Sequence, residues 1–578
     1  MKRRRFAFAT ICALIIALLC TGLVSFSAAS HSETRRGKSQ GDERMKVRVQ
    51  PWGPTQEMLD EAAARLSRQE QVRRQLKGAK SRLVSLEVIA EDEKSNPDLV
   101  PPSRYRGTFY DYTNNVAVVA ESSFDRQDVV NVTTSTVQPL PNKEELDEAL
   151  DIIKADPKLG PALVSERLQF YPPMPPLYLG AKSKSGRVER TVNVGLLAKD
   201  PNDKTLEHVN EIVGVNLSRR TVIRFPDGAP PAAKAGPTAT CGPASGGSST
   251  GRGVAGQYQF VISDVDGTEL WSFLAVRPSA SSGVDGSGIE LAQVKYKGKL
   301  LLKRANVPIL NVNYDSNTCG PFRDWQYAES QFDADPSNGT NVVSGVRSCT
   351  VPATTQLDTG VDTGNHQGIA FYTQDDETIL VSEMSAGWYR YISEWRFGMD
   401  GTLKPRFGMG ATSNSCTCNG HVHRAYWRLD FDVDGISNRV SNGFKLLRPA
   451  PIVQPLATEG KQYRSKKSFW IIRNNQTGSA YQIVANDNDG TAVSEPYGKG
   501  DFWLLRYDKN ELDDRNTRTD TSAGLDAFVN NQSTVDTDIV VWYAVHINHN
   551  RPGGHIMGHP FALSGEMVAG PDIVPLSW

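Results

Sequence analysis

Hydrophobic and polar positions follow two different periods along the first 225 residues. Apolar residues recur at helical spacing in "TQEMLDEAAARLSRQEQVRRQL" (residues 55–76) and in "NKEELDEALDIIKADPKL" (residues 142–159). After each helical stretch come runs dominated by β-branched and aromatic residues, which are typical of strands. We therefore predict two copies of one helix-plus-antiparallel-sheet plan, over residues 46–140 and 141–225.

A segment dense in Pro, Gly, Ala and Ser follows, and we interpret residues 226–253 as a linker. From residue 254 to 578 no helical period is convincing. Short runs rich in Val, Ile, Tyr, Phe and Trp alternate there with turn residues, which predicts a large β-sandwich. The expected fold class is α+β, with two small modules before a large β-sandwich domain.

The N-terminus has the pattern of a secretory signal. Four basic residues precede the apolar run "FAFATICALIIALLCTGLV", and small residues follow it, all within residues 1–30. The run is also nearly long enough to span a membrane, so an uncleaved anchor stays open. We expect a secreted or extracytoplasmic protein that contacts a membrane only if this segment is retained.

Charge and cysteine content narrow the picture. Lys and Arg total 64 against 65 Asp and Glu, so no basic surplus points to nucleic acid as a partner. Outside the cytosol, some of the cysteines that follow the signal should pair. Cys416 and Cys418, which adjoin the histidine motif described next, could instead form a soft-metal pair. The cysteines that follow the signal are Cys241, Cys319, Cys349, Cys416 and Cys418.

Six of the nine histidines gather in two places, at 421–423 and 546–559. His421 and His423 are two residues apart, so on a strand they share a face and offer two imidazoles to one ion. Imidazole suits copper, zinc, iron and nickel. A solvent-facing polar pair is the alternative, and the second histidine cluster favours a metal. His546 and His549 differ in parity, so we expect only one of them to face that ion.

Carboxylates follow the first histidine pair on the same predicted strand. Asp430 and Asp432 share a face, and Asp430 is seven residues past His423, which places it on the opposite face. Carboxylates are hard ligands that favour Ca²⁺ or Mg²⁺. A hard-cation site and a solvated outer face both fit this pattern. Asp434 precedes a glycine and is interpreted as a turn residue.

Taken together, these motifs resemble the copper amine oxidases, the topaquinone enzymes that oxidise primary amines. "HVHRAYWRLDFDVDG" is similar to the strand that supplies two copper ligands in that family, which implies His421 and His423 as ligands. "DIVVWYAVHINHNRP" is similar to the later strand that supplies the third ligand, which falls on His549.

The resemblance also implies catalytic residues. "SAGWYRYISEWRFGMDGT" is similar to the strand whose tyrosine becomes topaquinone, and the match falls on Tyr389. "SQFDAD" resembles the motif of the catalytic base, which falls on Asp333. "ILNVNYD" resembles the segment whose tyrosine contacts the quinone, which falls on Tyr314.

A peripheral calcium site is a further implication of the resemblance. Its carboxylates would be Asp430, Asp432 and Asp538, and the carbonyls of Phe431 and Ile539 would complete it. This agrees with the alternation argument, which puts Asp430 and Asp432 on the face away from the histidines.

The implied activity is oxidative deamination of primary amines by oxygen, giving aldehyde, ammonia and hydrogen peroxide in a homodimer with copper and topaquinone. The sequence departs from the family around the cofactor tyrosine. Trp388 replaces an asparagine, Arg390 an acidic residue and Ser385 a threonine. These changes motivate an alternative: a copper-binding homologue without quinone activity that serves as a binding or structural protein.

Overall fold

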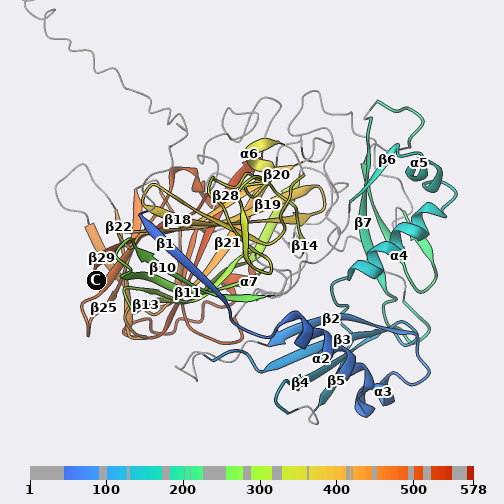
Figure 1. Ribbon diagram of the computed structural model, residues 1–578, viewed down its shortest axis with the longest axis horizontal. Coiled ribbons are helices and arrows are strands. Elements are labelled where there is room, and N and C mark those ends of the chain that lie inside the picture. The colour runs from blue at the N-terminus through green and yellow to red at the C-terminus, as the bar shows by residue number, and fades with distance from the viewer. Residues whose placement is uncertain are drawn as a thin grey trace, which may run out of the picture. The chain divides into compact units, whose positions relative to one another are not determined.

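The computed structural model describes most of the chain after residue 43 (Figure 1). The expected signal in residues 1–30 and the expected linker at 226–253 lie outside the described residues. No helix in the described part is long and apolar enough to cross a membrane. The described ranges are 44–89, 100–126, 130–171, 182–200, 202–207, 210–224, 256–277, 288–314, 328–360, 363–411, 417, 421–444, 452–465, 467–492, 500–511, 523–549 and 569–578.

The first module is a four-stranded antiparallel sheet covered by helices. The predicted helix over residues 55–76 forms as two, because Gln69 between them is extended (ψ 134°). Ala62 and Leu66 of the first helix are buried against sheet residues that include Tyr105 and Phe109. The elements are α2 (Gln56–Arg68), α3 (Glu70–Gln75), β2 (Ser81–Ile89), β3 (Arg104–Asp111), β4 (Val116–Ser123) and β5 (Asn131–Ser135).

The second module repeats this plan, as predicted, with its own four-stranded antiparallel sheet beside its helices. Asn142 and Glu145 form a reciprocal capping box that begins α4. Glu145 is also paired inside the module with the buried Arg190. The elements are α4 (Lys143–Lys154), α5 (Gly160–Val164), β6 (Leu168–Tyr171), β7 (Thr191–Ala198), β8 (Asn210–Asn216) and β9 (Thr221–Ile223).

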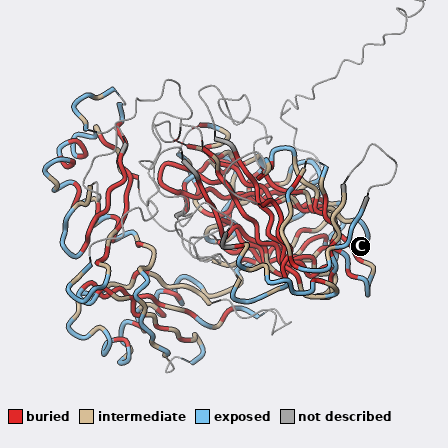
Figure 2. Tube along the Cα trace, turned by 180° about the vertical axis from the view of Figure 1, so that it is seen from behind, coloured by how far each residue is buried: buried red, intermediate tan, exposed pale blue. Residues whose placement is uncertain are grey.

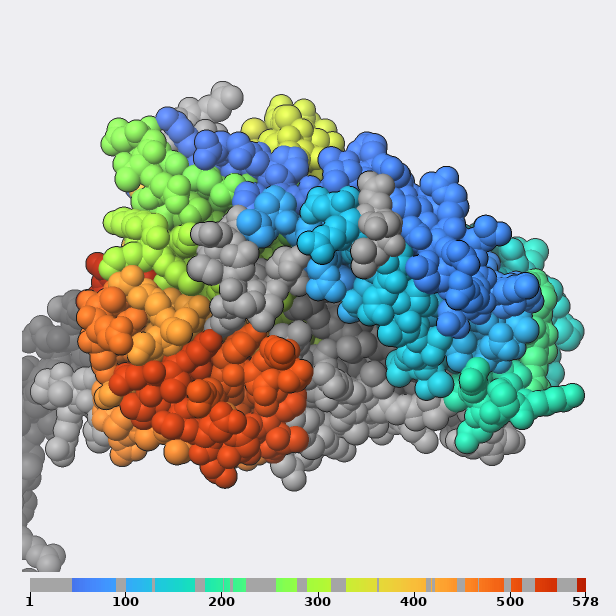
Figure 3. Space-filling model, turned by 90° about the horizontal axis from the view of Figure 1, so that it is seen from below, coloured from blue at the N-terminus to red at the C-terminus, as the bar shows by residue number. Residues whose placement is uncertain are grey.

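A nine-stranded sheet forms one layer of the sandwich within the described residues, in the order β1-β10-β11-β12-β13-β21-β28-β27-β24. Its edge strand β1 (Met45–Pro51) precedes the first module in sequence and pairs with β10, against which it lies in Figure 3. The other strands are β10 (Gln257–Asp264), β11 (Glu269–Val276), β12 (Glu290–Tyr296), β13 (Lys299–Tyr314), β21 (His421–Phe431), β24 (Gly460–Gln462), β27 (Phe502–Arg506) and β28 (Ile539–His549).

The facing layer has twelve strands in the described residues, with β14 (Ala328–Glu329) pairing beside β18. The others are β15 (Thr340–Val343), β16 (Val346–Ser348), β17 (Ile369–Gln374), β18 (Glu377–Ala386), β19 (Tyr389–Gly398), β20 (Leu403–Ala411), β22 (Asn438–Phe444), β23 (Ile452–Leu456), β25 (Ser468–Asn474), β26 (Ala480–Val484) and β29 (Asp572–Ser577). Short helices α6 (Gln356–Thr359), η3 (Asp487–Asp489) and α7 (Ala523–Asp526) lie in connections.

The main core lies between the two large sheets, and Figure 2 shows their strands as the most continuously buried part of the chain. Alternate residues of each strand point inward, so aromatic rings of the two layers meet. Phe273 of β11 stacks on Phe397 of β19 with ring centroids 4.2 Å apart. The predicted β-sandwich is confirmed, and its two central strands β19 and β21 carry the residues singled out from the sequence.

Candidate functional site

Two tyrosines of one sheet meet two histidines of the other. The Tyr389 hydroxyl lies 2.7 Å from Nε2 of His421, and the Tyr391 hydroxyl lies 3.0 Å from Nδ1 of His423. All four side chains are at most 3% exposed. Buried polar groups of this kind are stable only when hydrogen-bonded, so the four side chains fix one another across the core.

Strand alternation explains why these four residues meet. Each pair is two residues apart on its strand, and β19 and β21 face each other across the core. The Tyr389 and His423 ring centroids are 4.6 Å apart, and Tyr389 stacks beside Tyr391 at 5.7 Å. The prediction that both histidines share one face therefore agrees with the geometry.

Register places two further predicted residues beside this group. Position 314 on β13 and position 549 on β28 are both paired with His421 on the central strand β21. Directly opposite positions share a face of a sheet, so this row is where a third ligand and a neighbouring tyrosine are expected. The side chains of Tyr314 and His549 lie outside the described residues.

The nearby His546 is engaged elsewhere. It is paired with Arg424, one position off the His421–His423 face, and its Nε2 lies 2.9 Å from Oδ1 of Asp501. Asp501 also accepts a hydrogen bond from the backbone N–H of Arg464. Although burial alone would raise it, the pKa of Asp501 is held below its usual value by His546 and Arg464. This agrees with the expectation that only one of the two histidines faces the ion.

Two departures from the family motif form one local structure. The Arg390 guanidinium is buried and donates to Ser385 Oγ at 3.0 Å, Gly387 O at 2.9 Å and Tyr389 O at 2.8 Å. These contacts hold the tight turn between β18 and β19, where Gly387 has φ 58°. Trp388 of the same turn is buried and packs edge-on against Tyr171 of the second module.

The neighbours of Asp333 pack against the sheet that carries Tyr389. Asp333 forms a backbone bridge with Thr354, and its neighbours Phe332 and Ala334 belong to a cluster with Ile392 of β19. Ile392 alternates with Tyr389 and Tyr391, so this cluster lies on the other face of the sheet. The motif match to "SQFDAD" thus falls on a segment outside the sandwich core.

Glu329, four residues earlier, lies on the inner face and was missed by sequence reasoning. It is paired with Met384 of β18, which in turn is paired with Tyr391 of β19, so the three positions form one row. Glu329 is fully buried and hydrogen-bonded to the Arg277 guanidinium. Burial raises the pKa of Glu329 although Arg277 opposes the shift. The placement of Glu329 on the inner face follows from the pairing of β14 with β18.

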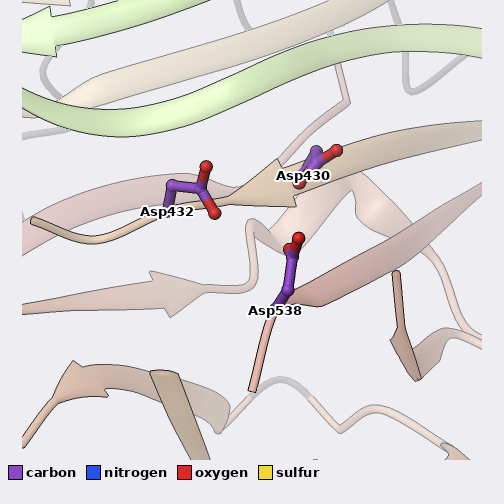
Figure 4. Close-up of side chains that lie close together, drawn as sticks. All are labelled: Asp430, Asp432 and Asp538. Carbon is purple, nitrogen blue, oxygen red and sulfur yellow. The ribbon is translucent and has the colours of Figure 1, made fainter. Parts of the chain in front are cut away.

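Three aspartates converge at the other end of β21. Asp430, Asp432 and Asp538 each offer a carboxylate oxygen, and these oxygens lie within 4.8 Å of one another (Figure 4). Phe431 and Ile539, whose carbonyls were expected to complete a site, are directly paired. The register of β21 with β28 is unbroken from His421 to Phe431, so Asp430 lies on the face opposite the histidines, as expected.

Comparison with known proteins supports the family resemblance. No family model matches the chain. Curated relatives from Arthrobacter sp. (strain P1), a primary amine oxidase and a copper methylamine oxidase, are each 23% identical over 214 residues. The match covers 28% of this chain and 33% of each relative, so it spans about a third of their length.

Solved structures match over nearly the whole chain. A copper-containing benzylamine oxidase from Hansenula polymorpha aligns with 12% identity and a TM-score of 0.51, covering 93% of this chain and 94% of its own. Lysyl oxidase from Pichia pastoris aligns with 13% identity and a TM-score of 0.53, covering 91% and 90%. The two modules and the sandwich of this chain therefore have the fold of the copper amine oxidases, the family that its motifs resemble.

Proposed function

We propose that the chain is an exported primary-amine oxidase that uses copper and a quinone formed from Tyr389. It would convert primary amines and oxygen to aldehyde, ammonia and hydrogen peroxide. The observation that carries the proposal is the buried contact of Tyr389 with His421, at 2.7 Å, beside His423. Topaquinone chemistry needs this combination of a tyrosine and imidazoles in one closed space.

The residues present fit a copper ion. Neutral imidazoles are suitable ligands for Cu(II), and His421 and His423 are two of them. His421, His423 and, by its register, His549 would hold the ion. Bound copper would supply the oxygen chemistry that modifies Tyr389 and reoxidises the cofactor.

The chain's own residues would exclude water and orient the reacting groups. Tyr389 is 1% exposed, and the rings of Tyr391 and His423 pack beside it. A dry, fixed environment strengthens every charge interaction in the site. Position 314, in the same row as His421, is where a second phenol would contact the quinone.

The reaction also needs a carboxylate that takes a proton from the carbon next to the amine nitrogen. The motif favours Asp333, and position favours Glu329, which lies on the inner face in a row with Tyr391. Burial raises the pKa of Glu329, which is the direction that makes a carboxylate a stronger base. We therefore propose Glu329 as the base, with Arg277 holding its carboxylate in place.

The three aspartates at the far end of β21 would hold a structural calcium ion, because hard oxygen ligands suit that cation. We further propose that the protein is secreted or extracytoplasmic, and that it forms a homodimer as the family resemblance implies. Neither calcium nor dimerisation takes part in the chemistry proposed for Tyr389.

A second candidate function is a copper-binding protein without a working quinone. It is favoured by the buried Arg390, which replaces an acidic residue and donates directly to the Tyr389 carbonyl. Peroxide release distinguishes the two functions. Copper-loaded protein given a panel of primary amines should release peroxide and aldehyde, and Tyr389→Phe should abolish both. Tight copper binding without peroxide from any amine would favour the second function.

A further inference from the structure

The two tyrosine–histidine pairs differ in the nitrogen that each tyrosine contacts. Tyr389 meets His421 at Nε2, whereas Tyr391 meets His423 at Nδ1. The two nitrogens of an imidazole point away from each other. An atom hydrogen-bonded to one of them is therefore kept away from an ion bound to the other. The two hydroxyls thus lie on different sides of their histidines, and they differ in how near they lie to any metal that the histidines share.

We propose that Tyr391 is a positioning residue whose oxygen accepts the Nδ1–H of His423 and so makes Nε2 the nitrogen that binds copper. Tyr391 itself then stays unmodified, while Tyr389 is oxidised. This inference rests on the proposed function and assigns a distinct role to each tyrosine. Histidines that bind metals generally donate their other N–H to a fixed acceptor, which sets the tautomer and ring orientation.

Packing makes Tyr391 a rigid acceptor. Its ring stacks between Tyr389 at 5.7 Å and Phe407 at 5.5 Å, and both Tyr391 and His423 are fully buried. On either side in the sheet its partners are Met384 of β18 and Met409 of β20, both buried. The hydroxyl therefore has little freedom to leave His423, and the hydrogen bond is shielded from water.

A phenylalanine at position 391 would keep this packing and remove only the hydroxyl. The matched control is Tyr481→Phe, because Tyr481 is also fully buried in the same core cluster and gives its hydroxyl to a backbone oxygen, Gly401 O, at 3.1 Å. Both variants lose one buried hydrogen bond, so they should lose similar stability. Only Tyr391→Phe should affect the histidine.

The experiment has three readouts. In the metal-free protein, ¹⁵N NMR of labelled histidine reports the tautomer of His423, assigned with His423→Gln. Competition with a chelator reports copper affinity, and electron paramagnetic resonance reports the copper environment. Finally, trypsin cuts after Arg390 and separates Tyr389 from Tyr391, so a phenylhydrazine adduct can be assigned to one tyrosine.

We expect His423 to carry its proton on Nδ1 in the wild type and in Tyr481→Phe, and to lose this preference in Tyr391→Phe. Copper affinity should fall about 10–100-fold in Tyr391→Phe alone, with an altered resonance spectrum. Unchanged tautomer and affinity in Tyr391→Phe, or an adduct on the peptide that begins with Tyr391, would overturn the inference. If the wild type binds no copper, the proposed function fails, and the tautomer of the metal-free protein still decides the role of Tyr391.

Discussion

Replacing Asp538 by asparagine removes one of three carboxylates whose oxygens lie within 4.8 Å of one another. At that separation two negative charges repel by about 3.5 kcal/mol at an effective dielectric constant of about 20. Three such carboxylate pairs repel one another, whereas the Arg428 guanidinium, 3.6 Å from Asp430, contributes an attraction of about 4.6 kcal/mol on the same scale. Without a cation the wild-type cluster is therefore strained, and Asp538→Asn should tolerate metal removal better than the wild type.

Calcium binding should reverse that strain and stabilise the fold. Calcium at 100 times its dissociation constant stabilises by about 2.7 kcal/mol. For a sandwich of about 320 residues, with an unfolding entropy of about 2.1 cal/mol/K per residue, this raises the melting temperature by about 4 °C. Scanning calorimetry with chelator and then with calcium measures the shift. Asp538→Asn should lose most of it.

Asp536→Asn is the matched control. Asp536 is two residues away and exposed, and it pairs with Arg439 rather than with the cluster. An exposed ion pair contributes little, so this variant should keep the full calcium response. The reasoning would be refuted if calcium left the wild-type melting temperature unchanged, or if Asp538→Asn responded as strongly as the wild type.

Two further predictions concern buried carboxylates. Glu329→Gln should lower kcat by about 10²–10⁴-fold while copper content and the phenylhydrazine adduct persist. The kcat of Asp333→Asn should stay within a few-fold of wild type. The reverse outcome would identify Asp333 as the base. The pKa of Asp501 is lower in the folded state than in the unfolded state, so its ionised form stabilises the fold. This stabilisation is present above the unfolded pKa of about 3.9 and is lost as pH falls through the folded pKa. Asp501→Asn should therefore have a lower melting temperature than the wild type at pH 7, and the difference between the two melting temperatures should shrink below about pH 4. A difference that stays constant with pH would contradict this linkage.

Local spacing was enough to predict the parts of the site that lie on one strand. Residues alternate between the two faces of a strand, so spacing alone places His421 and His423 on one face and Asp430 on the other. The register of β21 confirms both placements. Both small modules were likewise visible in their apolar periods. The break at Gln69 was not, because helix-forming residues continue on either side of it.

Contacts between strands could not be predicted in this way. Glu329 reaches the inner face only because β14 pairs with the end of β18, and a two-residue strand leaves no period in the sequence. The Tyr391–His423 hydrogen bond depends on how the two sheets stack. The role of Asp333 as the base stays a prediction from its motif, whose neighbouring residues Phe332 and Ala334 pack on the outer face.

The central claim is that Tyr389 becomes a quinone at a copper site. The most direct test loads metal-free protein with copper in air, adds phenylhydrazine, and identifies the modified tryptic peptide by mass. The account predicts a coloured adduct on the peptide that ends at Arg390, and none when His421→Ala removes a ligand. Copper bound at full occupancy with no adduct on that peptide would contradict it.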